Sequence, residues 1–244
     1  MLPVAILAGG LATRLRPLTD QIPKALIEVS GCPFAFHQLE LLRGKGVEDV
    51  IFCTGYRGEM IEEAVGDGSR WGMRIRYSPD GPTLLGTGGA LRRAAALLGE
   101  RFFVLYGDTY LDCDYAAVAR ASEDLGKLAL MTVFRNDNQW DRSNVALREG
   151  KIVRYDKRDS SPDMHHIDWG LGVLSAEALR QYPDWETFDL ADLYQELLRR
   201  GELAAFEVDN RFYEIGSAAG IEETERFLSH QKRSPDELYD ATLE

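Results

Sequence analysis

The sequence predicts an α/β fold: a Rossmann-like, doubly wound, mixed but mostly parallel sheet with helices on both faces and a small additional lobe. Short apolar runs alternate with longer segments of helical period, which is the pattern of strand–helix units. The runs are almost continuously apolar, as in strands that are buried on both faces. A length of 244 residues with 45% hydrophobic residues is sufficient for one sizeable core.

The first half of the chain contains four expected strands, at residues 3–7, 50–54, 75–78 and 102–106. Segment 34–46 carries Phe34, Leu39 and Leu42 at helical spacing and ends in glycines, which favour a helix C-terminus. Segment 88–99 shows the same pattern. Two such units between apolar strands indicate a doubly wound sheet.

The pattern changes after Gly126. Strands are expected at residues 128–134, 144–155, 170–174, 203–208 and 211–216, the second of them a hairpin that turns at Glu149 and Gly150. Helices are expected at 175–182 and 189–200, and Ser217 is expected to cap a final helix. Residues 234–244, with four acids and no base, are predicted to form an acidic C-terminal appendage.

The charge distribution excludes one class of partner and favours another. A net charge of −12 argues against nucleic-acid binding, which requires a dense basic face. The first 26 residues nevertheless hold Arg14, Arg16 and Lys24 against the single acid Asp20. Such a local cluster can concentrate positive potential within an acidic protein, so a small anionic ligand is expected there.

The cysteines and the apolar segments bear on location. Cys32, Cys53 and Cys113 are odd in number and far apart, which favours reduced thiols over a disulfide framework or a metal site. The N-terminus has no basic leader, and no stretch is long enough to span a bilayer. The expected location is therefore cytoplasmic, with no membrane partner, and assembly into a homo-oligomer is left open.

The loop after the first strand is the strongest candidate for an anion site. Gly9 and Gly10 follow that strand at the carboxyl edge of the sheet, where they allow backbone N–H groups to approach phosphate oxygens. Arg14 can bridge two such oxygens, and Lys24, behind Pro23, adds a point charge. The glycine patterns of dinucleotide-binding and P-loop proteins are absent, and two adjacent glycines alone are also typical of a tight turn.

The string "LAGGLATRLRPLTDQIPKAL" (residues 7–26) resembles the signature loop of sugar-1-phosphate nucleotidyltransferases. Members of that family join an NTP and a sugar phosphate to give a nucleotide sugar and pyrophosphate. Ala12 stands where the family usually has glycine. The resemblance implies catalytic roles for Arg14 and Lys24. It also implies nucleotide contacts from Leu7, Ala8, Gly9, Gly10 and Thr13.

The resemblance covers most of the chain and implies a single nucleotidyltransferase domain over residues 1–233. Its nucleotide-binding part is expected at about 1–126 and its sugar-binding part at about 127–233. Residues 66–80 and 84–91 are similar to the segments that lead into and form the nucleobase pocket. Backbone groups of Thr87, Gly88 and Gly89 at a helix start could read a base edge. These two glycines are equally typical of a flexible helix start.

Two carboxylates are candidates for binding Mg²⁺, which prefers oxygen ligands. Asp108 follows the apolar strand of "FFVLYGDTYLD" and is expected at the sheet's carboxyl edge, as metal ligand and catalytic residue. The alternative is a turn-capping aspartate. Glu214, in "FYEIGSAAGIEE", occupies the second acid position of the family; the alternative is a buried salt-bridge acid. Asp112 and Asp114 are expected to cap the next helix.

The string "RYDKRDSSPDMHHIDWGLGVL" resembles the family's sugar-phosphate segment. The resemblance implies that Lys157 contacts the sugar phosphate and that Asp156 and Asp168, with the nearby Gly170, face the sugar. The family more often shows Glu-Lys-Pro where this chain has Asp-Lys-Arg. The adjacent residues His165 and His166 are assigned to a loop and not to a metal site, because neighbouring side chains diverge and no third ligand is near.

The predicted activity is Mg²⁺-dependent, in-line transfer of a nucleotidyl group from an NTP to a sugar 1-phosphate. "LLGTGGAL" with "FFVLYGDTY" is similar to heptose 1-phosphate guanylyltransferases, and "GDGSRWGMRIRYSPD" to N-acetylmuramate 1-phosphate uridylyltransferases. Guanylyl transfer to a heptose or hexose 1-phosphate is favoured, with uridylyl or cytidylyl transfer as the alternative. A noncatalytic regulatory protein that binds nucleotide sugars is the alternative from another class; an NAD-dependent oxidoreductase is disfavoured by the missing glycine fingerprint. The sequence leaves pathway and allosteric ligands undecided.

Overall fold

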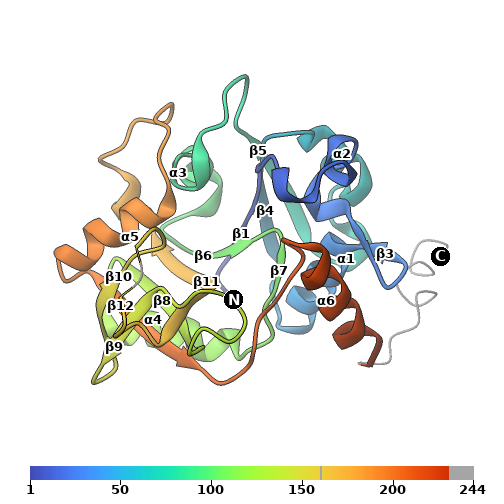
Figure 1. Cartoon of the computed structure of the whole chain (residues 1–244). Helices are drawn as coiled ribbons and strands as arrows, with labels where there is room; N and C mark the ends of the chain where they lie inside the picture. Colours follow the sequence, from blue (N-terminus) through green and yellow to red (C-terminus); the bar gives the residue numbers. More distant parts are fainter. Residues whose placement is uncertain (160, 231–244) are drawn as a thin grey trace.

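The computed structural model describes residues 1–159 and 161–230 of the chain. They form a mixed sheet with helices on both faces, which confirms the predicted fold class (Figure 1). The path of the sheet is β10-β9-β11-β6-β1-β4-β5, and β8 pairs with both β11 and β12. The predicted appendage at 234–244 lies outside the described residues.

The first part of the sheet is parallel and carries the strands expected from the apolar runs. It consists of β1 (Val4–Ala8), β4 (Asp49–Thr54), β5 (Arg74–Pro79) and β6 (Arg101–Tyr106). β1 lies between β4 and β6, with Val4 opposite Val50 on one side and Phe103 on the other. The chain therefore crosses from one side of β1 to the other, as in a doubly wound sheet.

Alternate side chains of these strands enter two cores on opposite faces. Val4 and Ile6 pack beneath α1 (Phe34–Gly44), α2 (Gly58–Val65) and α4 (Tyr115–Leu125), whereas Ala5 packs beneath α3 (Gly86–Leu98) and α5 (Leu190–Arg199). Figure 1 shows α1 and α2 on one side of the sheet and α3 and α5 on the other. The period-two alternation of a strand explains why these strands are apolar throughout.

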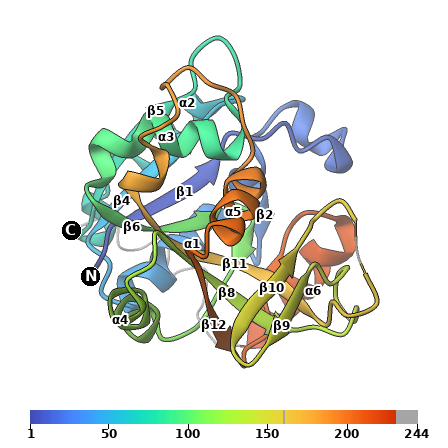
Figure 2. The same cartoon turned by 90° about the vertical axis from the view of Figure 1, so that its left-hand side faces the viewer.

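The second part of the sheet is mainly antiparallel and lies beside the first (Figure 2). It consists of β8 (Ala129–Arg135), β9 (Val145–Arg148), β10 (Lys151–Tyr155), β11 (His166–Ser175) and β12 (Leu203–Val208). β11 is antiparallel to both β6 and β8, and β12 is parallel to β8. The predicted hairpin is confirmed: Glu149 and Gly150 turn with φ of 52° and 72° between β9 and β10.

Three local predictions differ from the structure. The helix expected at 175–182 is wrong, because only the 3-10 helix η5 (Ala176–Leu179) forms there. Tyr182 precedes Pro183, a position that disfavours helical backbone. The strand expected at 170–174 begins earlier, at His166, and that at 211–216 is reduced to β13 (Tyr213–Glu214).

The helix caps agree with the sequence. Asp114 begins α4 with its Oδ1 accepting from the N–H of Ala117 at 2.9 Å. Ser217 precedes α6 (Ala218–His230), and its Oγ accepts from the N–H of Gly220 at 3.0 Å. Asp112, expected to share the capping of α4, instead pairs with Lys45.

A third, smaller core holds the N-terminal loop against the end of the chain. Leu15 packs there with Ile215 and with Leu228 of α6. The remaining short elements are η1 (Thr13–Leu15), η2 (Leu18–Asp20), η3 (Lys24–Leu26), β2 (Glu28–Val29), β3 (Cys32–Pro33), η4 (Ser69–Trp71) and β7 (Thr109–Tyr110). Of these, η4 packs through Trp71 into the core beneath α1 and α2. This core packs the loop after β1 against the C-terminal helix α6.

All three cysteines are free thiols, as the sequence predicts. None of the helices in the described ranges combines the length and the apolar character that crossing a bilayer requires.

Candidate functional site

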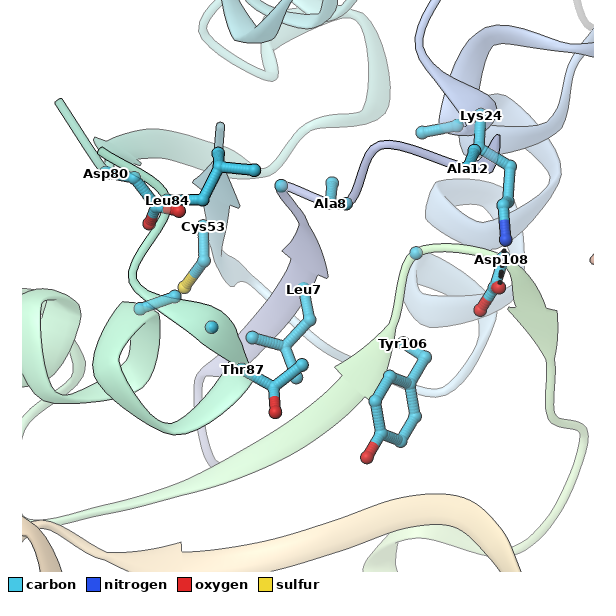
Figure 3. A pocket seen from close by; sticks show the side chains of 16 residues that line it. Leu7, Ala8, Ala12, Lys24, Cys53, Asp80, Leu84, Thr87, Tyr106 and Asp108 are labelled. Atoms are coloured by element: carbon cyan, nitrogen blue, oxygen red, sulfur yellow. Dashed lines mark hydrogen bonds and ion pairs between the residues drawn. The ribbon is translucent and has the colours of Figure 1, made fainter. Parts of the chain in front are cut away.

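A pocket opens at the carboxyl ends of β1, β4 and β6, the edge where open α/β sheets bind ligands (Figure 3). The loops after β1 and β6, the loop between β5 and α3, and the first turn of α3 form its walls. It is lined by Leu7, Ala8, Gly9, Gly10, Ala12, Lys24, Ala25, Cys53, Asp80, Leu84, Gly86, Thr87, Ala90, Tyr106, Gly107 and Asp108. The glycine loop and the 107–108 turn therefore lie at the same rim, as the sequence interpretation required.

Glycines allow the three strand-end loops to touch through their backbones. A Cβ at Gly55 would lie 2.6 Å from the carbonyl oxygen of Gly9, and one at Gly107 would lie 2.9 Å from that of Leu7. The N–H of Gly107 donates to the same Leu7 oxygen at 2.9 Å. Any side chain at these positions would push the loops apart.

Ala12, in the left-handed backbone conformation, and the buried Leu15 hold the rest of the first loop in place. Ala12 has φ 49° and ψ 41°, which glycine adopts without strain, and its carbonyl accepts from Thr19 Oγ1 at 2.9 Å. Leu15 is buried, whereas Thr13 and Arg14 are exposed and lie outside the set of residues that line the pocket. The positive charge of Arg14 nevertheless acts on Glu214.

Lys24 and Asp108 meet across the pocket rim. Lys24 Nζ lies 2.8 Å from Asp108 Oδ2, and their side chains are 18% and 26% exposed. Figure 3 shows this pair joined by a dashed line at one end of the pocket. The sequence interpretation assigned both residues to the site, and the structure brings them into contact.

Glu214 lies beside this pair. β13 pairs with β7 so that Glu214 is opposite Thr109, and the N–H of Ile215 donates to the carbonyl of Asp108 at 2.9 Å. Burial raises the pKa of Glu214, and the negative charge of Asp108 raises it further, while Arg14 and Lys24 oppose the shift. The two predicted carboxylates are thus neighbours whose charges repel.

This donor set fits a hard divalent cation. Carboxylate oxygens are the ligands that Mg²⁺ prefers, and a cation between them would relieve their repulsion. Over residues 1–159 and 161–230, no group of three or more histidine, cysteine or acidic side chains is arranged to hold a metal. Phosphate oxygens and water would therefore complete the coordination.

Gln38 supports the 107–108 turn, a role that the sequence interpretation missed. It is 1% exposed, and its Nε2 donates to the carbonyls of Tyr106 at 2.9 Å and Thr109 at 2.7 Å. These bonds hold both ends of the turn that carries Asp108. A polar side chain on the buried face of the predicted helix at 34–46 was the available signal.

Residues at the start of α3 form hydrogen bonds with Phe188 and Asp189. The amides of Gly88 and Gly89 donate to the carbonyl of Phe188 at 3.0 and 3.3 Å, so these two groups, expected to face a base, already have a partner. A Cβ at Gly88 would lie 2.2 Å from the Phe188 ring, which explains the glycine by close packing. Thr87 lines the pocket and donates from Oγ1 to Asp189 Oδ1 at 2.9 Å.

A second lysine–aspartate pair lies beside Tyr106. Lys157 Nζ is 3.0 Å from Asp168 Oδ2 and 3.2 Å from the hydroxyl of Tyr106, which lines the pocket. Burial lowers the pKa of Lys157, but Asp168, Tyr106 and Tyr155 together raise it by more, so the pKa lies above its ordinary value. Gly170 stands two residues further along β11 with φ 99°, and its amide donates to Asp168 Oδ1 at 3.1 Å.

Asp156, His165 and His166 have other partners within the chain. Asp156 is half-buried, and its Oδ1 accepts from the amides of Arg158 and Asp159 at 2.8 and 3.0 Å, which lowers its pKa. Its carboxylate thus stabilises its own loop. His165 contacts Asp137, whereas His166 begins β11 and contacts Glu207, so the two imidazoles have separate partners.

The fold and the pocket together define a wound α/β protein with a pocket at the carboxyl edge of its parallel strands. The chain belongs to the nucleotidyl transferase family, because the model of that family matches residues 4–143, more than half of its length.

Two curated relatives illustrate the similarity. N-acetylmuramate alpha-1-phosphate uridylyltransferase of Neisseria meningitidis is 39% identical over 121 residues, which are 49% of this chain and 52% of the relative. D-glycero-alpha-D-manno-heptose 1-phosphate guanylyltransferase of Campylobacter jejuni is 28% identical over 212 residues, which are 86% of this chain and 93% of the relative. The match thus spans about half the length of the first relative and nearly all of the second.

A solved structure is similar throughout. HddC from Yersinia pseudotuberculosis, crystallised in complex with GMP-PN, superposes with a TM-score of 0.79 at 25% identity, covering 93% of this chain and 100% of that one.

Proposed function

We propose that this chain transfers a nucleotidyl group from an NTP to a sugar 1-phosphate and releases pyrophosphate. The observation that carries the proposal is the meeting of the glycine loop, Lys24 and Asp108 at one rim of the pocket, with Glu214 next to Asp108 through the pairing of β13 with β7. In this proposal residues 1–126 bind the nucleotide and residues 127–233 bind the sugar. Both substrates are soluble metabolites, so the proposed reaction belongs to the cytoplasm.

The reaction requires no general base. A phosphate oxygen of the sugar 1-phosphate attacks the α-phosphorus of the NTP, forming a new P–O bond, and the bond between the α-phosphorus and the bridging oxygen breaks to release pyrophosphate. The attacking oxygen is already anionic at neutral pH. Catalysis therefore depends on placing two anionic substrates in line and on neutralising their charge.

Residues of the first loop are proposed to bind the triphosphate. Gly9 and Gly10 let the phosphates approach the backbone, with Leu7, Ala8 and Thr13 in the same loop. Lys24 and Arg14 stabilise the charge that develops on the leaving pyrophosphate. When bound to Asp108 and Glu214, Mg²⁺ would neutralise phosphate oxygens.

The opposite wall is proposed to bind the sugar 1-phosphate. Lys157 contacts its phosphate, and the lysine side chain is 36% exposed. Asp168 orients this lysine and faces the sugar hydroxyls, while Gly170 allows the sugar to approach the backbone closely. Asp156 contributes by shaping the loop that carries Lys157. Thr87 lies near the base, where Gly88 and Gly89 act through packing.

Guanylyl transfer is the favoured reaction, because the relative matched over nearly its whole length is a guanylyltransferase and the similar crystal structure holds a guanine nucleotide. Uridylyl transfer is the second candidate, favoured by the higher identity of the uridylyltransferase over half of the chain.

The test is pyrophosphate release with Mg²⁺ from each of the four NTPs, against a panel of hexose and heptose 1-phosphates. We expect one NTP to release pyrophosphate with at least one sugar 1-phosphate, in an amount equal to the nucleotide sugar found by mass spectrometry. A protein that binds the nucleotides and forms no pyrophosphate with any pair would instead be a regulatory binding protein.

A further inference from the structure

The first loop, which carries Arg14 and Lys24, has few buried residues of its own. Leu15 and Thr19 are buried, but most other side chains from residue 10 to residue 20 are exposed. The position of such a loop depends on its contacts with neighbouring segments. Charges that stabilise a leaving group must be in place before the reaction, so contacts that fix this loop should affect turnover.

Two residues after β4 hold the first loop near both of its ends. The N–H of Tyr56 donates to the carbonyl of Gly9 at 3.2 Å, where the loop begins. The hydroxyl of Tyr56 donates to the carbonyl of Asp20 at 3.1 Å, and Arg57 Nη2 donates to the same oxygen at 3.0 Å. Asp20 shortly precedes Lys24 in the chain, so these bonds fix the backbone that leads to the lysine.

The two side chains form a closed hydrogen-bond network with the loop. Arg57 Nε donates to the hydroxyl of Tyr56 at 2.9 Å, and that hydroxyl donates in turn to the carbonyl of Asp20. The guanidinium presents its N–H groups in a fixed plane, so it reaches the hydroxyl and the carbonyl together. A carbonyl oxygen has two lone pairs, which match the two donors at Asp20.

The backbone of Arg57 adopts a strained conformation. Arg57 precedes α2 with φ 53° and ψ 35°, the left-handed region that glycine occupies most readily. The next residue is a glycine for a packing reason, since a Cβ at Gly58 would lie 2.6 Å from the Cβ of Thr54. Arginine thus occupies a position where its backbone costs stability, and such strain is typical of positions that serve a function.

Tyr56 and Arg57 act on the first loop and not on the ligand. Neither is among the described residues that line the pocket. The same segment touches the loop through its backbone, because a Cβ at Gly55 would lie 2.6 Å from the carbonyl oxygen of Gly9. The residues after β4 therefore contact the first loop through backbone at Gly9 and through side chains at Asp20.

Building on the proposed function, we infer that Tyr56 and Arg57 are positioning residues. They hold the first loop so that its cations, Arg14 and Lys24, face the triphosphate. Release of the Asp20 carbonyl would let the exposed part of the loop move and carry both cations away from the phosphates. Binding of the sugar 1-phosphate does not depend on this contact.

The first test is Tyr56→Phe, which removes the hydroxyl and keeps the ring. We expect kcat to fall by about tenfold while the KM for the sugar 1-phosphate stays constant. Affinity for inorganic pyrophosphate with Mg²⁺, measured by calorimetry, should fall by about threefold or more. The matched control is Tyr77→Phe, which removes a hydroxyl that donates to the carbonyl of Gly66 at 2.6 Å. Wild-type kcat or wild-type pyrophosphate affinity in Tyr56→Phe would overturn the inference.

The second test separates the geometry of Arg57 from its charge. Arg57→Lys keeps the charge and Arg57→Ala removes it, yet both should lower kcat by about tenfold or more, because neither presents the planar fork of arginine. The double variant Tyr56→Phe/Arg57→Ala should be little worse than either single variant, since the network acts as a unit. Arg74→Ala, which removes an exposed arginine paired with Asp49, is the control. Wild-type turnover in Arg57→Lys would assign the effect to charge and overturn the inference.

Hydrogen exchange measures the position of the loop directly. The amide of Asp20 donates to the carbonyl of Pro17 at 3.0 Å, within the loop. Exchange of this amide and its loop neighbours should accelerate by about tenfold or more in Tyr56→Phe and Arg57→Ala, while the amides of β1 keep their protection. Unchanged exchange in the loop of both variants would overturn the inference even if turnover falls.

The two hypotheses fail separately. If no sugar phosphate releases pyrophosphate with any NTP, the proposed function fails, but hydrogen exchange and pyrophosphate affinity still test Tyr56 and Arg57. If the wild-type chain releases pyrophosphate and the variants do so at the same rate, the proposed function stands and the positioning inference is wrong.

Discussion

The two lysine–aspartate pairs of this chain differ in how completely their charges are balanced. Lys24 and Asp108 are separated by 84 residues and meet between two loops, beside the second acid Glu214. Lys157 and Asp168 lie within one segment, and the hydroxyls of Tyr106 and Tyr155 also contact them at 3.2 and 3.3 Å. The first pair has an excess of negative charge, whereas the second is neutralised within the chain.

This difference distinguishes a pair of carboxylates that could bind a cation from a carboxylate whose charge a lysine already balances. At Asp108 and Glu214, a divalent cation and phosphate oxygens can complete the charge balance. At Asp168, which is 3% exposed on its side chain, the lysine already does so. We therefore expect substitutions in the first pair to affect chemistry most, and substitutions in the second to affect sugar binding and stability.

The largest effect is expected for Asp108→Asn, which removes a proposed metal ligand while keeping its shape. Pyrophosphate release should fall by about 10³-fold or more, with a small change in Tm, because the side chain is partly exposed. Binding of Mn²⁺, followed by electron paramagnetic resonance, should weaken in parallel. Asp112→Asn, which removes a surface partner of Lys45, is the control and should retain activity. Unchanged Mn²⁺ affinity in Asp108→Asn would show that the metal binds elsewhere.

The next largest effect is expected at Arg14, an exposed arginine near the Lys24–Asp108 pair. Arg14→Ala should lower turnover by about 10²- to 10³-fold, since Arg14 is proposed to stabilise the leaving pyrophosphate. Because Arg14 is exposed, urea unfolding should be nearly unchanged. Arg16→Ala, in the same loop and paired with Asp20, is the matched control. Near-normal turnover of Arg14→Ala would exclude the proposed role.

Lys157→Met tests the balanced pair. The KM for the sugar 1-phosphate should rise by about tenfold or more while the KM for the NTP stays constant. Stability should fall by about 1–2 kcal/mol, allowing for the partial exposure of Lys157, because Asp168 loses its partner. A change in the KM of the NTP alone would instead place Lys157 on the nucleotide side.

The pH dependence of the same variant sharpens this comparison. The pKa of Lys157 is raised in the folded chain, so the stability it contributes is fully present below the ordinary lysine pKa of about 10.4. This contribution to stability is lost as the pH rises through the pKa that Lys157 has in the folded chain. The difference in unfolding free energy between wild type and Lys157→Met should therefore be constant from about pH 6 to 9 and shrink only above about 10.4.

The smallest effect concerns the loop that precedes Lys24. Ala12 has φ 49°, a conformation that is strained for alanine and free for glycine. Ala12→Gly should stabilise the chain by about 0.5 kcal/mol, since relief of strain is partly offset by the entropy of glycine in the unfolded state. Thermal unfolding measures this change. A drop in Tm would mean that the entropic cost dominates.

The sequence predicted best those features that depend on neighbouring residues. The hairpin at Glu149 and Gly150 and the helix caps at Asp114 and Ser217 involve contacts within a few positions. The helix expected at 175–182 was wrong: only η5 forms there, and Pro183 disfavours helical backbone at Tyr182.

Residue type and local spacing by themselves predicted that this chain forms a wound α/β sheet with glycines, lysines and carboxylates after its strands. Only the tertiary structure decided which of these side chains meet. It brings Lys24 to Asp108, places Gln38 under the 107–108 turn, commits the amides of Gly88 and Gly89 to Phe188, and joins Arg57 to the carbonyl of Asp20. The reason is that such contacts depend on strand order and on the packing of segments far apart in the chain, which no local pattern encodes.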